Sequence, residues 1–451
     1  MKLSESLKTG RTAARVKHDE DFNGGLDLST YNAVKSMVHF RLVERLDLTT
    51  MTALPQDALA EGVREALQEI TAAEHLPLNQ TERSMLVADL MNEIMGLGPL
   101  EPLMADPTVQ DILVNGHSHV YVEKDGILKS TAIRFRDNEH LMQIIDRIVS
   151  AVGRRVDESS PMVDARLPDG SRVNVIIPPL SLSGPVLSVR KFSHQALTVK
   201  ALIENGTLTA EMHGYLQAAV KSRLNILISG GTGVGKTTFL NILSGYIPEA
   251  ERIITIEDSA ELRLHQPHVV SLEARPGNVE GRGHVTMTDL VRNSLRMRPD
   301  RIIVGEARGG EVMDMLQAMN TGHPGSMSTI HANSPRDALS RIQVMADMGE
   351  SSFSERALRG LVSSALNVIV QLARLVDGRR RVTSVTEVTG LQGETISSQE
   401  VFLFEQHGVS SKGAAYGVFR GTGVVSAFFD HFRTYGLNLS PEIFSSRREV
   451  R

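Results

Sequence analysis

The chain has 451 residues, of which 41% are apolar and 22% charged, a composition typical of a soluble globular protein with roughly two to four domains. It contains no cysteine, which excludes disulfides, thiolate catalysis and cysteine-bound zinc. The net charge of −5 and the 4% aromatic content argue against a nucleic-acid-binding protein. The polar start lacks the apolar core of a secretory signal, and no stretch reaches the roughly 18–20 apolar residues of a membrane span.

The first 195 residues change character twice. Residues 1–28 are polar and are predicted to be a disordered tail. Residues 29–99 are a predicted helical segment, because apolar residues recur there at helical spacing, and Thr81 is the expected N-cap of its third helix. Residues 100–195 are a predicted α+β domain. Its expected strands are 111–115, 120–124, 172–177 and 186–192, with a helix over 140–152.

From residue 196 onward, short apolar strands alternate with helices. The predicted strands are 225–229, 252–257, 301–305 and 326–331, and the first helix is 210–222. This alternation indicates a parallel sheet flanked by helices, so we expect an α/β domain over residues 196–390. Residues 391–451 are a predicted small α+β extension. Further elements are expected in the C-terminal region, as strands at 367–373, 383–388 and 401–405 and a helix near 425–435.

A glycine-rich loop follows the first strand of this alternating region. The sequence NILISGGTGVGKTT begins at Asn225, so Gly230 is followed after four residues by Gly235, Lys236 and Thr237. Glycines let main-chain N–H groups converge on an anion, and the following helix adds the positive end of its dipole. In this pattern the lysine reaches the β- and γ-phosphates and the threonine hydroxyl binds Mg²⁺. The predicted ATP-binding residues are Gly230, Gly231, Thr232, Gly233, Val234, Gly235, Lys236, Thr237 and Thr238.

Acidic residues follow two further strands. The strand RIITIE ends in Glu257, with Asp258 next and Glu261 one turn later, and Glu306 follows the strand RIIVG. Since ligands of open parallel sheets bind beyond the carboxyl ends of the strands, these acids should lie on the same edge as the loop. Hydrolysis needs Mg²⁺ and an oriented water there, although surface acids that cap helix starts remain the structural alternative. The predicted metal ligands are Thr237, Glu257, Asp258 and Glu306.

A histidine lies where a predicted strand meets a helix start. In STIHANSPRDA, residues 328–338, His331 follows the strand, and Ser334 with Pro335 is typical of a helix N-terminus. On this window alone, a core histidine at a strand end is the simpler interpretation. Because the glycine-rich loop and the acids should share its sheet edge, we predict that His331 lies near the γ-phosphate as a sensor. His323 is a second candidate, for which a structural role remains open.

Four stretches resemble, in order and spacing, the Walker A, Asp box, Walker B and His box of the secretion ATPase superfamily: GGTGVGKTT, ITIEDSAEL, RMRPDRIIVGEARGGE and GHPGSMSTIHANSPRDAL. Three phrases resemble the CpaF/TadA branch, the ATPases of Flp (tight-adherence, type IVc) pilus assembly: GLGPLEPLMADPTVQDILVNG, DARLPDGSRVNVIIPPL and SLRMRPDRIIVGEARGGEVMDMLQAMNTGH. The resemblance runs from about residue 80 to the end. It implies an α/β fold: a RecA-like P-loop ATPase domain with a parallel sheet, preceded by a smaller α+β domain and an N-terminal helical segment.

The resemblance also implies roles for individual residues. By match to the family motifs, Glu261 is the base or the water-orienting residue, Glu306 helps to hold Mg²⁺ and the water, and His331 is the sensor. Which glutamate is the general base stays open. Relatives use arginines of the smaller domain to close over the phosphates, and a planar guanidinium suits phosphate oxygens. The matching positions are Arg166, Arg172 and Arg190, for which an ordinary surface role is the alternative.

Partners follow from the same resemblance. It implies a cytoplasmic, Mg²⁺-dependent ATPase that forms a homo-hexameric ring and lies at the inner membrane through pilus platform proteins. Pilin would be an indirect partner, and nucleic acid is not expected. A type IV secretion ATPase that moves protein or DNA is the alternative within the superfamily. A small-molecule kinase and a nucleotide-binding scaffold without turnover are two further classes, both less consistent with an intact set of boxes.

Overall fold

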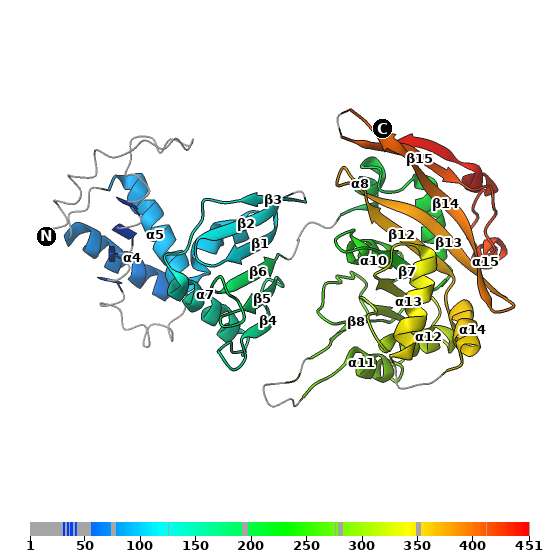
Figure 1. Cartoon of the computed structure of the whole chain (residues 1–451), viewed down its shortest axis with the longest axis horizontal. Coiled ribbons are helices and arrows are strands. Elements are labelled where there is room, and N and C mark those ends of the chain that lie inside the picture. Colours follow the sequence, from blue (N-terminus) through cyan, green and yellow to red (C-terminus); the bar gives the residue numbers. More distant parts are fainter. Residues whose placement is uncertain are drawn as a thin grey trace. The chain divides into compact units, whose positions relative to one another are not determined.

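The computed structural model of the chain describes residues 56–73, 78–124, 126–191, 197–275, 277, 283–348, 353–411 and 413–450, and part of a helical stretch between residues 30 and 42. The chain divides into two compact units, Met1–Ser193 and His194–Arg451 (Figure 1). The predicted disordered tail lies outside the described residues. Within the described part of the chain, no helix is both long and apolar enough to cross a membrane.

The first unit begins with two described helices, α4 (Gln56–Ala73) and α5 (Gln80–Met95). The N-cap of α5 is Asn79, because its side chain accepts the N–H of Glu82 while the Glu82 carboxylate accepts the N–H of Asn79. This reciprocal box satisfies two helix-end donors at once, so the prediction of Thr81 as the cap was wrong by two residues. The two helices contribute to a shared apolar cluster that includes Leu67, Ile70, Leu86 and Leu90.

The rest of the first unit is an antiparallel sheet covered by helix α7 (Asn138–Ala151). The strands lie in the order β3-β2-β1-β6-β5-β4. Four of them, β1, β2, β5 and β6, match predicted strands, whereas β3 and β4 were not predicted. A short helix, α6 (Glu101–Ala105), precedes the sheet. The strand bounds are β1 Val109–Asn115, β2 His119–Lys124, β3 Ile127–Ser130, β4 Met162–Arg166, β5 Arg172–Ile176 and β6 Val186–Arg190.

The second unit is built on a mixed sheet whose described strands lie in the order β16-β15-β14-β13-β12-β7-β11-β10-β8-β9. The strands from β12 to β9 run parallel to one another, which confirms the expected α/β class. Edge strand β9 was not predicted. The bounds of the parallel strands are β7 Ile226–Gly230, β8 Ile253–Glu257, β9 Val269–Glu273, β10 Arg301–Val304, β11 Met327–Ile330 and β12 Val368–Arg374.

Helices cover both faces of this sheet and bury two apolar clusters (Figure 1). Helices α9 and α10 pack in one cluster, and α11 to α14 pack in the other. Each β-strand that ends at the glycine-rich or acidic stretches is therefore buried on both sides, as its continuous apolar sequence predicts. The helix bounds are α8 Val199–Glu204, α9 Ala210–Lys221, α10 Lys236–Ser244, α11 Met287–Ser294, α12 Glu311–Asn320, α13 Pro335–Asp347 and α14 Glu355–Ala365.

The C-terminal residues continue the same sheet. Strand β13 pairs antiparallel with β12, and β14, β15 and β16 follow in antiparallel order. The boundary expected at residue 390 falls inside β13, and strands β13 to β16 extend the α/β sheet. Strands β15 and β16 were not predicted. The bounds are β13 Arg380–Gln392, β14 Thr395–Val409, β15 Ala415–Gly421, β16 Arg447–Val450 and helix α15 Phe429–Thr434.

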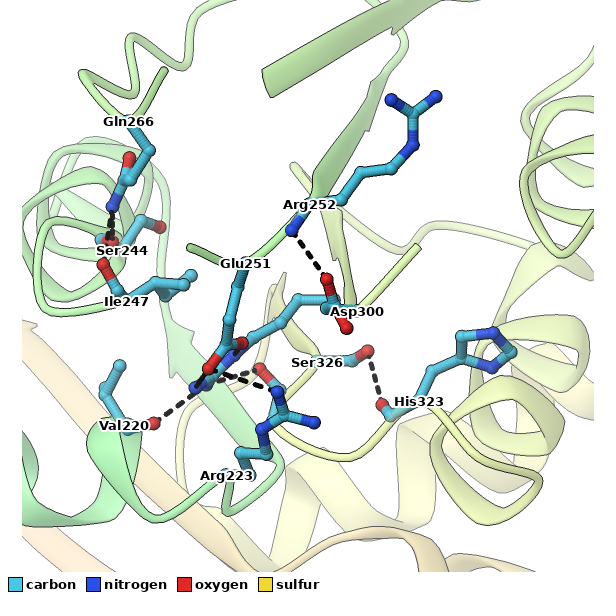
Figure 2. Close-up of polar contacts among 12 residues, drawn as sticks. Val220, Arg223, Ser244, Ile247, Glu251, Arg252, Gln266, Asp300, His323 and Ser326 are labelled. Carbon is cyan, nitrogen blue, oxygen red and sulfur yellow. Dashed lines mark hydrogen bonds and ion pairs between the residues drawn. The ribbon is translucent and has the colours of Figure 1, made fainter. Parts of the chain in front are cut away.

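A buried ion pair ties together the amino ends of the parallel strands. Arg301, fully buried at the start of β10, donates to both carboxylate oxygens of Glu251, at 2.6 and 3.2 Å. It also donates to the carbonyls of Val220 and Gly325, at 2.8 and 3.2 Å. Arg223 adds a second cation 3.3 Å from Glu251 (Figure 2). The network therefore joins the end of α9, the approach to β8, the start of β10 and the turn before β11.

Candidate nucleotide-binding site

The glycine-rich loop connects β7 to α10, as predicted for a phosphate-binding loop. Gly233 and Gly235 have φ angles of 71° and 90°, which only glycine adopts at little cost. A Cβ on Gly230 would lie 2.6 Å from the carbonyl oxygen of Leu372 in the neighbouring strand. Gly230 ends β7, and the other eight predicted ATP-binding residues lie on this loop or in the first turn of α10, whose N–H groups have no partner within the helix.

Lys236 is buried and folds back over the loop. Its Nζ donates to the carbonyl of Gly231 at 2.8 Å and lies 3.3 and 3.4 Å from Nδ1 and Nε2 of His331. Burial lowers the pKa of Lys236, and the nearby charge of Arg308 lowers it further, while Glu306 opposes both. A phosphate anion bound at the loop would favour the charged form of Lys236 and so oppose the effect of burial.

His331 and Glu306 meet beyond the carboxyl ends of β11 and β10. Nε2 of His331 lies 3.0 Å from Oε1 of Glu306. The tautomer of the ring determines which nitrogen donates and which accepts in the contacts with Lys236 and Glu306. Burial, followed by the charge of Lys236, lowers the pKa of His331, although Glu306 opposes this. The ring lies between the loop lysine and an acid that follows β10, two strands away from the loop strand β7.

Arg308 was not singled out from the sequence, yet it organises the acids. It forms a bidentate ion pair with Glu306, in which Nε lies 2.9 Å from Oε1 and Nη2 lies 3.0 Å from Oε2. Its Nη1 lies 3.4 Å from Oδ2 of Asp258. The hydrogen bond with Glu306 and the charges of Glu306, Asp258 and Glu261 raise the pKa of Arg308. Burial alone would raise the pKa of Glu306, but Arg308, His331 and Lys236 hold it below its usual range.

The Glu257 carboxylate mainly binds main-chain N–H groups. Its buried carboxylate accepts the N–H of Glu261 at 2.8 Å and the N–H of Leu262 at 3.0 Å. It thereby closes the turn that carries Asp258 and Glu261. A Cβ on Gly305 would lie 2.7 Å from Cγ of Glu257, so the two strand ends are in contact. The predicted acids of both strands are thus brought together, with Glu257 holding the turn and Arg308 at their centre.

The donor set limits how a metal ion can be held. Among the described residues, no group of three His, Asp or Glu side chains is arranged to bind a metal ion. Mg²⁺ at nucleotide sites keeps several waters and takes one or two protein oxygens besides the phosphates. Thr237, second in α10, and Glu306 fit such a sparse set. Glu257 fits it less well, because its carboxylate already accepts two N–H groups.

His323 lies at the opposite end of β11 from His331. Its carbonyl accepts a hydrogen bond from Ser326 at 2.9 Å, on the side of the sheet where Glu251 and Arg223 lie (Figure 2). Seven residues separate the two histidines, and the four of them that form β11 span about 13 Å of strand. His323 therefore lies away from the edge that carries His331 and Glu306, and its role stays a prediction.

The three predicted arginines form one row in the first unit. Arg172 is the register partner of Arg166 on one side and of Arg190 on the other. Residues directly opposite each other share a face of the sheet, and like charges in such positions repel. At the end of the row, Nε of Arg190 lies 3.1 Å from Asp111. The shared face was not foreseen, because β4 was not predicted. Their role toward phosphate stays a prediction.

Comparison with known proteins places the chain in a family. The family described as type II/IV secretion system protein matches residues 93–424, and the type II secretion system protein E N-terminal domain matches residues 31–95. A Mycobacterium tuberculosis protein with a provisional conjugal-transfer name is 37% identical over 322 residues, which are 70% of this chain and 91% of that protein. Conjugal transfer protein TrbB of Rhizobium radiobacter is 31% identical over 67% of this chain and 90% of its own length.

Type IV secretion relatives are similar as well. The type IV secretion system protein VirB11 of Bartonella quintana is 32% identical over 331 residues, which are 64% of this chain and 91% of that protein. The crystal structure of the VirB11 ATPase of Brucella suis in complex with sulphate is 29% identical and covers 64% of this chain and 92% of its own, with a TM-score of 0.36. The match to the type II/IV secretion system protein family covers residues 93–424, which is most of this chain, so the chain belongs to that family.

Proposed function

We propose that this chain is the ATP-hydrolysing motor of a Flp (tight-adherence) pilus assembly machine, of the CpaF/TadA type. Membership of the secretion family and the stretches GLGPLEPLMADPTVQDILVNG and DARLPDGSRVNVIIPPL support this choice. The observation that carries the ATPase part is the contact of Lys236 with His331, which in turn contacts Glu306. A phosphate-loop cation, a sensor and an acid in one connected group are what phosphoryl transfer to water requires.

In this proposal each residue has a separate task. The loop N–H groups and Lys236 bind the β- and γ-phosphates. Glu306 or Glu261 orients the attacking water and takes its proton, and His331 donates a hydrogen bond toward the γ-phosphate. Arg308 holds Glu306 ionised and fixed in direction. Bound Mg²⁺, held by Thr237 and Glu306, would neutralise phosphate charge.

The arginine row of the first unit is proposed to bind the same nucleotide phosphates. Arg166, Arg172 and Arg190 place three cations side by side with Asp111 as a partner at one end. A planar guanidinium can bind phosphate oxygens through two N–H groups at once, which supports this role. ATP binding would then favour one arrangement of the two units and product release another, which is how hydrolysis would be converted into movement.

Assembly and location are proposals of the same kind. The chain would act as a homo-hexameric ring in the cytoplasm, attached to the inner membrane through platform proteins, with pilin as an indirect partner. Analytical ultracentrifugation with and without a non-hydrolysable ATP analogue tests the ring. We expect a species about six times the mass of the chain with nucleotide, and a monomer under both conditions would overturn this part.

A type IV secretion ATPase that moves protein or DNA is the alternative, and the names of the relatives favour it. TrbB is a conjugal transfer protein and VirB11 a type IV secretion protein. Deletion of the gene in its own organism, with complementation by wild type or Lys236→Ala, separates the two. Loss of surface pili with normal DNA transfer supports the pilus motor. Loss of transfer with normal pili supports the alternative.

A further inference from the structure

Arg380 reaches the phosphate-binding loop from a strand that the family motifs do not include. Its Nε donates to the carbonyl oxygen of Gly233 at 2.9 Å, across 147 residues of chain. Its Cδ lies 3.5 Å from where a Cβ on Gly235 would be. The side chain is exposed, and its two terminal nitrogens make no hydrogen bond with other residues that the structure describes. A long, exposed side chain seldom keeps such a contact unless its backbone is fixed.

The backbone around Arg380 is fixed by the turn that precedes it. The N–H of Leu375 donates to the carbonyl of Arg379 at 2.8 Å, which closes the β12–β13 turn. The Asp377 carboxylate accepts the N–H of Arg379 at 3.0 Å and the N–H of Ala415, in β15, at 2.8 Å. Strand β12 itself pairs with β7, the strand that leads into the loop. The side chain of Arg380 therefore extends from a rigid part of the same sheet.

The hydrogen bond from Arg380 to the carbonyl of Gly233 fixes the orientation of the Gly233–Val234 peptide. In a trans peptide, the C=O and N–H groups point in opposite directions. The carbonyl of Gly233 points toward Arg380, so the N–H of Val234 points away from it. Because Gly233 has a φ angle of 71° and can rotate easily, the peptide after it needs an external partner to stay in one orientation.

We propose that Arg380 is a positioning residue for the nucleotide phosphates: it holds the Gly233–Val234 peptide with its N–H toward the bound anion. The inference rests on the proposed ATPase function and adds a residue to the same site. Because Arg380 contacts a carbonyl oxygen of the loop, it acts on the phosphates through the loop. Its effect should therefore fall on nucleotide affinity, with little effect on turnover at saturation.

Three variants separate the hydrogen bond from the charge. Arg380→Met keeps the aliphatic stem and removes both. Arg380→Gln puts an amide N–H at the same number of bonds from the backbone as the arginine Nε, so it retains the donor and removes the charge. The matched control is Arg379→Met, because Arg379 is an exposed neighbour that pairs with Asp377 at 3.6 Å. Affinity for a fluorescent ADP analogue is measured by anisotropy on the full chain, and kcat and KM by phosphate release.

We expect Arg380→Met to raise the Kd for ADP and the KM for ATP about 10-fold, with kcat changed less than about twofold. Arg380→Gln should recover most of the lost affinity, and Arg379→Met should match wild type. Wild-type affinity in Arg380→Met overturns the proposal. Equal weakening in the Gln and Met variants also overturns it, because the effect would then be one of charge alone. Wild-type protein that binds no ADP overturns the ATPase function itself, a result distinct from both.

Discussion

His331 joins the phosphate loop to the acids of the next strand: its Nε2 lies 3.0 Å from Oε1 of Glu306, and its Nδ1 lies 3.3 Å from Nζ of Lys236. The ring thus contacts one residue that should bind phosphate and one that should direct the water. A change in the charge at the loop reaches Glu306 through a single side chain. This arrangement makes His331 suited to report whether the γ-phosphate is present.

His331→Ala is expected to bind ATP normally and to lose at least about 10-fold in kcat, because the loop and Lys236 remain while the link to Glu306 is removed. Binding is measured with a fluorescent nucleotide and turnover by phosphate release. His323→Ala is the matched control, since His323 lies at the other end of β11. Normal turnover and normal pilus or secretion output in His331→Ala would return His331 to a packing role.

Acid should destabilise the nucleotide-free protein partly through His331. Its folded-state pKa is lowered from 6.5 by burial and by Lys236, so the unfolded chain binds this proton more readily. The stability that His331 contributes is therefore complete above about pH 6.5 and falls as the pH drops toward the folded-state pKa. Wild type should lose free energy of unfolding relative to His331→Asn between about pH 7.5 and 5.5, as measured by urea unfolding. A constant difference over that range contradicts the lowered pKa.

Removal of one partner from the buried pair of Arg301 and Glu251 should strongly destabilise the fold. Glu251→Ala leaves the guanidinium of Arg301 buried with only carbonyl partners, at an expected cost of about 3–5 kcal/mol in the free energy of unfolding. Glu249→Ala, an exposed acid two residues earlier, should change it by less than about 0.5 kcal/mol. Urea unfolding of the full chain checks both. Replacing both partners, as in Glu251→Met with Arg301→Met, should recover much of the loss, and equal losses in the two single variants would refute this role.

Arg172 occupies the middle of the arginine row, between Arg166 and Arg190. If the row binds nucleotide phosphates, Arg172→Ala should lower kcat by about 10- to 1000-fold, because the charge developing on the transferred group loses a donor. Arg172→Lys should not restore it, since lysine lacks the planar fork. Arg154→Ala, an exposed arginine of the same unit, is the control. Turnover at the wild-type rate in Arg172→Ala would assign the row to structure alone.

Much of the nucleotide-binding edge could be predicted from the sequence, because its signals are local. Gly230 and His331 lie where continuous apolar strands end, Lys236 begins the helix after the glycine-rich loop, and the order of such strands predicts a common edge. Contacts over long separations could not be predicted in this way. The contact of Arg308 with Asp258 spans 50 residues of chain and that of Arg380 with Gly233 spans 147, and only strand pairing brings these groups together.

Three of the strands that were not predicted from the sequence, β3, β9 and β16, share a physical reason. Edge strands β3, β9 and β16 are short and exposed or half-buried, so they lack the apolar alternation on which strand prediction depends. The role of Glu251 was missed for a different reason. In the sequence, Glu251 resembles a surface acid after Pro248. Its burial depends on its ion pair with Arg301, which is 50 residues away in the chain.

Phosphate release from ATP by purified full-length chain, wild type against Lys236→Ala, tests the central claim most directly. Lys236 is buried against the loop and contacts His331, so its removal should lower the steady-state rate by at least about 100-fold. Lys221→Ala, in the last turn of α9, serves as a matched control and should keep the wild-type rate. A rate that is unchanged in Lys236→Ala would contradict the assignment of this loop as the site of ATP hydrolysis.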